Sequence, residues 1–249
     1  FGMDTNSKTI EKAISDKAIA QKCNHIEEFL AHNDDGIIVF ATSPSTVVKI
    51  IESNRKILNT NFSITDVSSS KLNISKFLDK YEPKNFVFSH PVAGSHKSGY
   101  ENSYKDFFDQ KKLIISKYSS HDEHYQRIHG LWTSLKADVL PLSIEEHENF
   151  FSATSHLPHL ISYALIKTIN DKDIDIEKFS AGGLSEFIRL TKSSETLWSD
   201  IFKSNLENIE KDTKAFINNM HELLEEASKT DSNSKSLLKK IQLIKKGVS

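Results

Sequence analysis

The feature that most constrains the fold is an alternation of short apolar runs with helical segments over the first 142 residues. The runs "GIIVFA", "FSITDV", "NFVFSH" and "KLIISK" are rich in β-branched and aromatic residues. Continuous apolar strands separated by helices are typical of a mostly parallel sheet covered on both faces. We therefore expect a doubly wound α/β domain over residues 1–142. The expected strands lie at residues 36–41, 62–67, 85–90, 112–117 and 138–143, and the expected helices at 8–18, 44–53, 74–81 and 122–137.

The pattern changes at Ser143, after which apolar residues recur at helical spacing with almost no glycine. We expect an all-helical domain over residues 143–249, joined by one irregular patch at residues 179–194. Long apolar stripes on helices are often buried against a second copy, so this half predicts a homodimer.

Composition excludes several classes of protein. Lys and Arg number 32 against 34 Asp and Glu, and no basic stripe with interleaved aromatic residues occurs, so nucleic acid is not an expected partner. No apolar run approaches the roughly 20 residues of a membrane helix, and no signal-peptide pattern is present. The single cysteine, Cys23, fits a reducing compartment. We expect a cytoplasmic globular protein without a membrane partner.

The first residues suggest a nucleotide-binding unit. Residues 1–3 resemble the end of a strand, and Asp4 follows them. An acid that ends the second strand of a doubly wound sheet holds the ribose 2′-hydroxyl of NAD, and the glycine fingerprint lies ~20 residues earlier. That fingerprint would precede Phe1, so we expect a chain that starts inside the unit. The alternative is that Asp4 only ends a surface strand. Because no Arg or Lys follows Asp4 immediately, NAD is favoured over NADP.

The segment "SHPVAGSHKSGY" carries the strongest catalytic signal. His90 stands at the end of an expected strand, Pro91 fixes the backbone after it, and Gly94 and Gly99 allow close approach to a ligand. A neutral imidazole accepts protons at physiological pH because its ordinary pKa is near 6.5. We predict that this segment presents His90 toward a ligand.

Four segments together resemble the prephenate dehydrogenase family, which includes arogenate and cyclohexadienyl dehydrogenases. They are "TDVSSSK", "SHPVAGSHKSGY", "EEHENFFSATSHLPHLISYAL" and "GGLSEFIRLTKSSETLWSDIF", and the likeness covers essentially the whole chain. The resemblance implies a Rossmann-type domain, here lacking its first β-loop-α, followed by an α-helical dimerisation domain. It implies NAD-dependent oxidative decarboxylation of prephenate to 4-hydroxyphenylpyruvate in tyrosine biosynthesis. The same chemistry on arogenate is the nearest alternative.

The resemblance assigns catalysis and cofactor contacts to two strand ends and one helix start. It makes His90 the acceptor for the ring hydroxyl and Ser69 the serine on the substrate and nicotinamide side, with Ser68 where glycine is usual. Asp4 is assigned to the cofactor. The remaining cofactor positions are Thr42, Ser43 and Pro44, at the start of the helix after the strand "GIIVFA".

The substrate contacts implied by the resemblance lie mostly in the helical half. Arg189 would bind a substrate carboxylate, for which a planar guanidinium suits better than a lysine; Glu186 and Ile188 replace the family's aspartate and threonine beside it. Trp198 corresponds to a tryptophan that reaches toward the neighbouring subunit's pocket. The other implied contacts are His156, His159, Gly94 and His96, the last standing where many members have glutamate.

Other interpretations remain open for several of these residues. His147 in "EEHEN" is compatible with capping, a local pair or a functional role. Ser69 is compatible with a helix N-cap, and Trp198 with the core. The pair His156 and His159 has metal-ligand spacing, but one cysteine and no clustered third ligand disfavour a metal site. A non-catalytic dimerisation or ligand-binding module is the alternative from another class, since the chain carries no phosphate-binding glycine loop.

Overall fold

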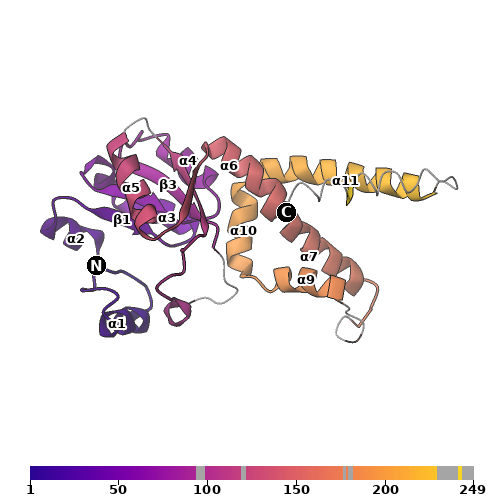
Figure 1. The fold of residues 1–249 in the computed structure, drawn as a ribbon, viewed down its shortest axis with the longest axis horizontal. Coiled ribbons are helices and arrows are strands. Elements are labelled where there is room, and N and C mark those ends of the chain that lie inside the picture. Colours follow the sequence, from indigo (N-terminus) through magenta and orange to yellow (C-terminus); the bar gives the residue numbers. More distant parts are fainter. Residues whose placement is uncertain (94–98, 119–121, 176–177, 179–181, 229–240, 243–249) are drawn as a thin grey trace.

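The computed structural model describes residues 1–93, 99–118, 122–175, 178, 182–228 and 241–242. An α/β half and a helical half lie side by side, and the long helix α11 of the helical half projects away from the α/β half (Figure 1). In the α/β half the elements are α1 (Ser7–Ser15), α2 (Ile26–His32), β1 (Ile37–Phe40), α3 (Pro44–Ser53), β2 (Ser63–Asp66), α4 (Leu72–Leu78), β3 (Phe86–Pro91), β4 (Lys112–Lys117), α5 (Asp122–Ser134) and β5 (Asp138–Pro141). In the helical half they are α6 (Ile144–Phe151), α7 (Leu157–Asn170), α9 (Gly182–Thr191), α10 (Glu195–Ser204) and α11 (Leu206–Ser228).

The five strands form one sheet in the order β1-β2-β3-β4-β5. All neighbouring strands are parallel except β3 and β4. The prediction of a mostly parallel sheet flanked by helices is therefore confirmed. Each expected strand forms, although β5 ends at Pro141, two residues early, because Ser143 caps the next helix.

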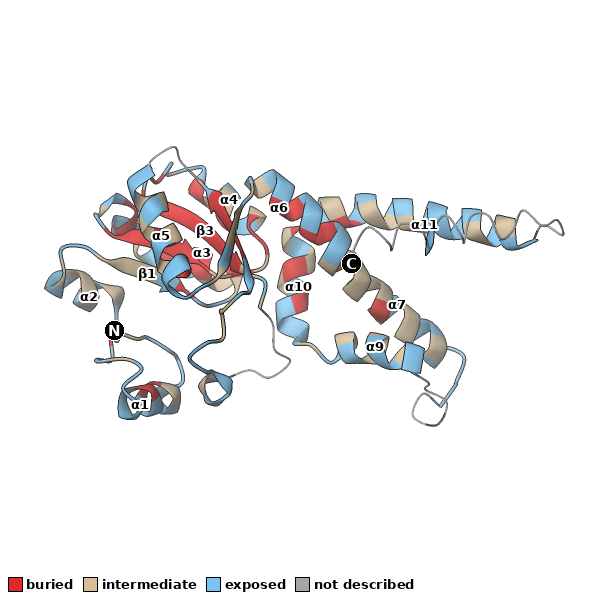
Figure 2. Cartoon of the chain, viewed as in Figure 1, coloured by how far each residue is buried: buried red, intermediate tan, exposed pale blue. Residues whose placement is uncertain are grey.

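Helices cover both faces of the sheet, because successive side chains of β3 pack against helices on opposite faces. Phe86 and Phe88 pack with Val47 and Ile51 of α3 on one face. Val87 lies on the other face, in a cluster that also holds Ile128 and Trp132 of α5 and Leu113 and Ile115 of β4. Figure 2 shows that the buried residues concentrate in the strands and the helix faces turned toward them. The core is thus centred on the strands whose ends form the site described below.

Three local predictions were wrong. Residues 1–3 form no strand of the sheet: Gly2 makes a single parallel bridge to Lys22. Helix α1 is capped by Asn6, whose side chain accepts from the Lys8 amide, so the cap is one residue earlier than Ser7. The patch at 179–194 contains a helix, α9, because Leu184 and the residues after it keep a helical apolar period that the paired glycines obscured.

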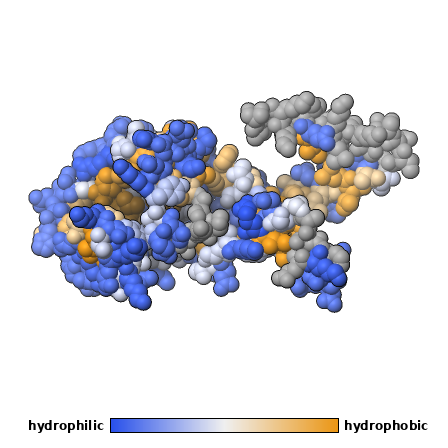
Figure 3. All heavy atoms as spheres, turned by 60° about the horizontal axis from the view of Figure 1, so that its bottom comes forward, coloured by the Kyte–Doolittle hydropathy of each residue, from blue (hydrophilic) through white to orange (hydrophobic). Residues whose placement is uncertain are grey.

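The helical half leaves apolar side chains uncovered on α11. Ile217 and Met220 are each 46% exposed and Leu224 is 64% exposed, at spacings of three and four residues. Figure 3 shows apolar surface on this projecting helix. Among the described residues, no helix is both long and apolar enough to cross a membrane.

Candidate active site

The site begins where three neighbouring parallel strands end. Phe40 of β1 is in register with Asp66 of β2, and Asp66 with Phe88 of β3. The segments after these residues therefore emerge at the same edge of the sheet. Ligands of open α/β sheets bind outside the carboxyl ends of the strands. This edge carries the predicted residues Thr42–Pro44, Ser69 and His90.

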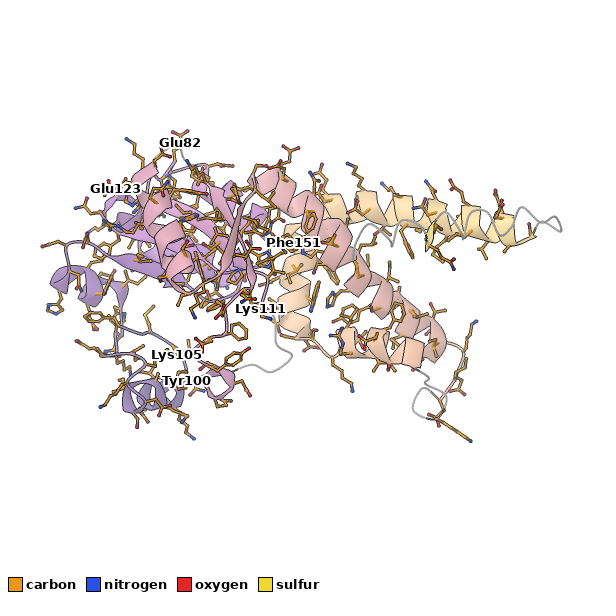
Figure 4. All side chains as sticks on the ribbon, viewed as in Figure 1. Glu82, Tyr100, Lys105, Lys111, Glu123 and Phe151 are labelled. Carbon is orange, nitrogen blue, oxygen red and sulfur yellow. The ribbon has the colours of Figure 1, made fainter. Side chains whose placement is uncertain are left out.

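His90 is the second-last residue of strand β3 and is 8% exposed. Its Nδ1 is 2.8 Å from Nε2 of His147, and its ring centroid is 4.5 Å from that of Phe151. Figure 4 labels Phe151 at the end of α6, where the chain continues toward α7. Burial, followed by the nearby Lys71 ammonium and His147, lowers the pKa of His90 well below its ordinary value. His90 is therefore a neutral imidazole at physiological pH.

His147 and Glu148 come to His90 from the first turns of α6. A capping box fixes this helix start, since Ser143 Oγ accepts from the Glu146 amide and the Glu146 carboxylate accepts from the Ser143 amide. Both His147 and Glu148 are buried, and His147 Nδ1 is 2.9 Å from Glu148 Oε1. Burial lowers the pKa of His147, although the hydrogen bond to Glu148 opposes this. His147 therefore makes the local pair that its sequence allowed, with Glu148, and it also contacts His90.

A buried ion pair ties the end of β2 to β3. Lys71 Nζ donates to Asp66 Oδ2 at 2.6 Å and to the Ser89 carbonyl at 2.7 Å, and both side chains are at most 1% exposed. Asp66 also accepts from the amide of Ser68 at 3.1 Å and from its hydroxyl. Burial lowers the pKa of Lys71, while Asp66 opposes the shift. The pair holds the turn between Asp66 and Lys71, on which Ser69 is half-buried.

The serine run after β2 does not cap the next helix with Ser69. Helix α4 begins at Leu72, with Lys71 at its N-cap and no side-chain cap bond. Ser70 donates to Glu148 Oε2 at 3.0 Å, and the Lys71 amide donates to Glu148 Oε1 at 2.6 Å. The N-cap interpretation of Ser69 was therefore wrong, because this turn bonds to α6 instead.

His156 is placed by a π turn, Ser152–His156, between α6 and α7. Pro158 has no N–H for the carbonyl four residues earlier, and π turns accommodate such interruptions, often at functional sites. His156 is 1% exposed, and its Nδ1 accepts from Asn205 Nδ2 at 3.2 Å. The same Asn205 nitrogen donates to the Glu148 carbonyl at 2.9 Å. Burial lowers the pKa of His156 to about 4, so this ring is also neutral.

His159, Trp198 and Arg189 form a second group, the open group, in which Arg189 is exposed, His159 is half-buried and Trp198 is buried. The rings of His159 and Trp198 are stacked, with centroids 3.5 Å apart. Burial lowers the pKa of His159, and the charge of Arg189 contributes to the same shift. The Arg189 side chain is 58% exposed and donates from Nε to Glu186 at 3.0 Å. Trp198 is 7% exposed and packs inside its own protomer.

Asp4 and Thr42 line a cavity of about 900 Å³ between the first residues and β1. The other lining residues are mainly apolar and include Val39, which is 44% exposed. Figure 3 shows the surface of the α/β half hollowed, with apolar residues in the hollow. Ser43 caps α3 and Pro44 is buried at the first turn, so these two predicted residues shape the helix start.

The structure thus places most of the predicted residues in three groups, with Ser69 on the turn after β2 and Ser43 and Pro44 at the start of α3. His90 and His156 share one buried cluster, His159, Trp198 and Arg189 form the open group, and Asp4 and Thr42 border the cavity. Gly94 and His96 lie outside the described residues. Among the described residues no three His, Cys, Asp or Glu side chains converge as metal ligands. The sequence reasoning did not identify Lys71, Ser70, Glu148 and Asn205 as parts of the cluster.

Comparison with known proteins accounts for nearly the whole chain. The family model described as prephenate dehydrogenase, nucleotide-binding domain, matches residues 1–140, and that described as prephenate dehydrogenase, dimerization domain, matches residues 143–243. The chain belongs to the prephenate dehydrogenase family. The resemblance found in the sequence motifs is confirmed.

Individual relatives agree with the family. The chain is 26% identical over 207 residues to prephenate dehydrogenase of Bacillus subtilis, a match to 80% of this chain and 56% of that protein. It is 27% identical over 180 residues to cyclohexadienyl dehydrogenase of Zymomonas mobilis, covering 68% of this chain and 56% of the relative. The chain thus spans little more than half the length of these relatives.

A solved structure extends the likeness to the fold. The crystal structure of prephenate dehydrogenase from Aquifex aeolicus with hydroxyphenyl propionate and NAD+ has a TM-score of 0.89 and 27% identity. It covers 100% of this chain and 88% of that chain. Both domains of the family fold are therefore present in this chain.

Proposed function

We propose that the protein is an NAD-dependent prephenate dehydrogenase that converts prephenate to 4-hydroxyphenylpyruvate. The observation that carries the proposal is a neutral, buried His90 held at the carboxyl end of β3, in one cluster with His147 and His156. Membership of the family supports the reaction class. The solved relative with hydroxyphenyl propionate and NAD+ supports the ligand chemistry, since its ligand is a phenol that carries a carboxylate.

The residues around the cavity fit the ribose end of a dinucleotide. The Asp4 carboxylate is exposed and borders the cavity, and a carboxylate accepts hydrogen bonds from ribose hydroxyls. Thr42 and the start of α3 lie at the carboxyl end of the neighbouring strand β1. We propose that Asp4, Thr42, Ser43 and Pro44 hold NAD, with Ser69 on its nicotinamide side. NAD, when bound, supplies the hydride acceptor.

His90 acts on the substrate hydroxyl. As the ring carbon loses its hydride, the C–O bond gains carbonyl character and the hydroxyl must release its proton. A neutral imidazole accepts that proton, and such general-base assistance contributes roughly 10²–10⁴-fold to the rate. Loss of carbon dioxide from the opposite ring carbon then leaves an aromatic phenolate, which takes the proton back from His90 to become the phenol. The buried surroundings of His90 keep it in the unprotonated form that this step requires.

The open group supplies recognition. Arg189 keeps guanidinium N–H groups beyond the one that Glu186 occupies, and its planar fork suits a carboxylate. A neutral His156 that accepts at Nδ1 carries its proton on Nε2, so it offers a donor to a substrate oxygen. We propose that Arg189 binds a carboxylate and that His156, His159 and Trp198 form the pocket wall. Gly94 and His96 remain predictions of the same kind.

The active protein is proposed to be a homodimer. The match to the dimerization domain and the exposed apolar residues on α11, which are Leu206, Ile217, Met220 and Leu224, support this assembly. The boundary is proposed at residues 142 and 143, where β5 has ended and Ser143 starts α6.

The test is an assay of the natural full-length protein with NAD and either prephenate or arogenate. The proposal predicts reduction of NAD with prephenate. A preference for arogenate above about tenfold would make arogenate the substrate in place of prephenate. The two compounds differ by an amine in place of a keto group, a difference that a few polar contacts can distinguish. A protein that binds NAD and reduces it with neither substrate would overturn the proposed function.

A further inference from the structure

The hydrogen bonds behind His90 converge on one carboxylate. Glu148 accepts from the Lys71 amide at Oε1 and from the Ser70 hydroxyl at Oε2. An ionised carboxylate has no hydrogen to donate. Its remaining contact, 2.9 Å from Oε1 to His147 Nδ1, therefore requires a proton on that ring nitrogen.

This requirement fixes the next hydrogen bond in the row. A neutral His147 with its proton on Nδ1 has a lone pair on Nε2. That atom is 2.8 Å from Nδ1 of His90, so His90 must donate from Nδ1. The opposite arrangement would place the His147 Nδ1 lone pair against a carboxylate oxygen. His90 then presents an unprotonated Nε2, which has no hydrogen-bond partner among the described residues.

We propose that His147 and Glu148 are positioning residues that hold His90 as the Nδ1-protonated tautomer, leaving Nε2 to accept the proton of the substrate hydroxyl. The inference rests on the proposed function for its catalytic meaning, whereas the tautomer itself is a property of the protein without substrate. Neither residue is assigned a contact with substrate or cofactor.

The surroundings keep both imidazoles neutral, as the row of hydrogen bonds requires. Burial is the largest influence on each and lowers both pKa values. Around His90 the charge of Lys71 acts in the same direction, as would a positive charge on His147 or His156. Around His147, Glu148 and Asp66 favour the protonated form and Lys71 opposes it. A doubly protonated His147, which would donate to His90 and reverse its tautomer, is thereby disfavoured.

Packing holds the rings in this arrangement. The Phe151 ring lies 4.5 Å from the ring of His90 and 4.6 Å from that of His147. Asn205 fixes the backbone of α6 through its bond to the Glu148 carbonyl. Rotation of either imidazole would break hydrogen bonds in a dry site, where unsatisfied polar groups are costly.

The tautomer is measurable by nitrogen NMR of histidine-labelled full-length protein without substrate. At neutral pH we expect the His90 ring to show a protonated Nδ1 and an unprotonated Nε2, with the signal assigned by its loss in His90→Asn. In His147→Phe, which keeps an aromatic ring beside Phe151 but has no acceptor, this single tautomer should be lost. The exposed His32→Phe change is the matched control and should leave the His90 signals unchanged.

Catalysis supplies a second readout. His147→Phe should lower kcat by about tenfold or more, a part of the general-base contribution, with a smaller change in KM. His147→Gln restores a carbonyl acceptor near the lost Nε2 and should recover most of that loss. Glu148→Gln keeps an acceptor oxygen for His147 and should cost less than His147→Phe.

The outcomes separate this inference from the proposed function. A wild-type His90 that carries its proton on Nε2 would overturn the inference whatever the activity. Equal activity losses in His147→Phe and His147→Gln would also overturn it, since they would indicate only a packing role. A wild-type protein that lacks activity but shows the expected tautomer would refute the proposed function and leave the positioning arrangement standing.

Discussion

The two ends of the candidate site are built differently. Around His90 every neighbour that orients the ring is buried, and His147, Glu148 and Lys71 are at most 1% exposed. Arg189, in contrast, is more than half exposed and is held by one hydrogen bond to Glu186 on its own helix. The chain thus fixes the proposed proton acceptor, whereas it leaves the proposed carboxylate-binding group free to adjust to a ligand.

The difference fits the roles that we propose for the two ends. A proton acceptor needs a defined tautomer and a dry environment, and both require partners that water cannot replace. A cation that captures an anion from solution benefits from an exposed charge, because long-range attraction acts before contact. Substitutions at the buried end should therefore change stability and kcat, and those at the exposed end mainly KM.

The largest expected effect on stability comes from breaking the buried ion pair. Lys71→Met leaves the Asp66 carboxylate uncompensated in the protein interior, and loss of one partner of such a pair costs about 3–5 kcal/mol. Urea unfolding measures this change. Lys112→Met, in the exposed pair with Asp138, is the matched control and should cost about 1 kcal/mol or less. Similar costs for both changes would show that burial of the Lys71–Asp66 pair adds nothing to stability.

A smaller effect is expected from pH, through the buried His156. Its pKa is about 4 in the folded protein and near 6.5 in the unfolded chain, so below pH 6.5 the unfolded state binds more protons. The free energy of unfolding therefore decreases as the pH is lowered, and His156 accounts for about 2 kcal/mol of that decrease between pH 7 and pH 5. Unfolding at several pH values should show a shallower slope in His156→Gln. An unchanged slope would show that His156 is solvated and lies outside the buried end.

The smallest energetic effect is expected at the exposed end. Arg189→Lys keeps the charge but loses the planar fork, and KM for prephenate should rise about tenfold while kcat changes less. The Lys192→Gln change removes an exposed charge nearby and serves as the control. A fall in kcat with constant KM would place Arg189 at the reacting end.

Sequence patterns predicted the fold well because they depend on local chemistry. Apolar runs such as "KLIISK" specify strands through burial on both faces, and β4 forms over the predicted residues Lys112–Lys117. Ends were less accurate where two signals compete: Asn6 rather than Ser7 caps α1. The paired glycines before Leu184 masked α9, because glycine is a signal for loops and also occurs at helix starts.

The site was predictable only in part, because its central contacts are non-local. His90 was recognisable from its strand end and motif. The partner His147 lies 57 residues away on a helix start, and its sequence also fits a capping role. Lys71 and Glu148 are charged residues that sequence alone would place in solvent. Only the folded contact between the turn after β2 and α6 shows that they belong behind His90.

The most direct test of the account is the activity of His90→Asn in the natural full-length protein, measured as prephenate-dependent reduction of NAD beside the wild type and the exposed His32→Asn control. The account predicts that kcat falls about 10²–10⁴-fold in His90→Asn, because the proton acceptor is removed. Circular dichroism should remain that of the folded protein. Turnover of His90→Asn at the wild-type rate, with the fold intact, would contradict it.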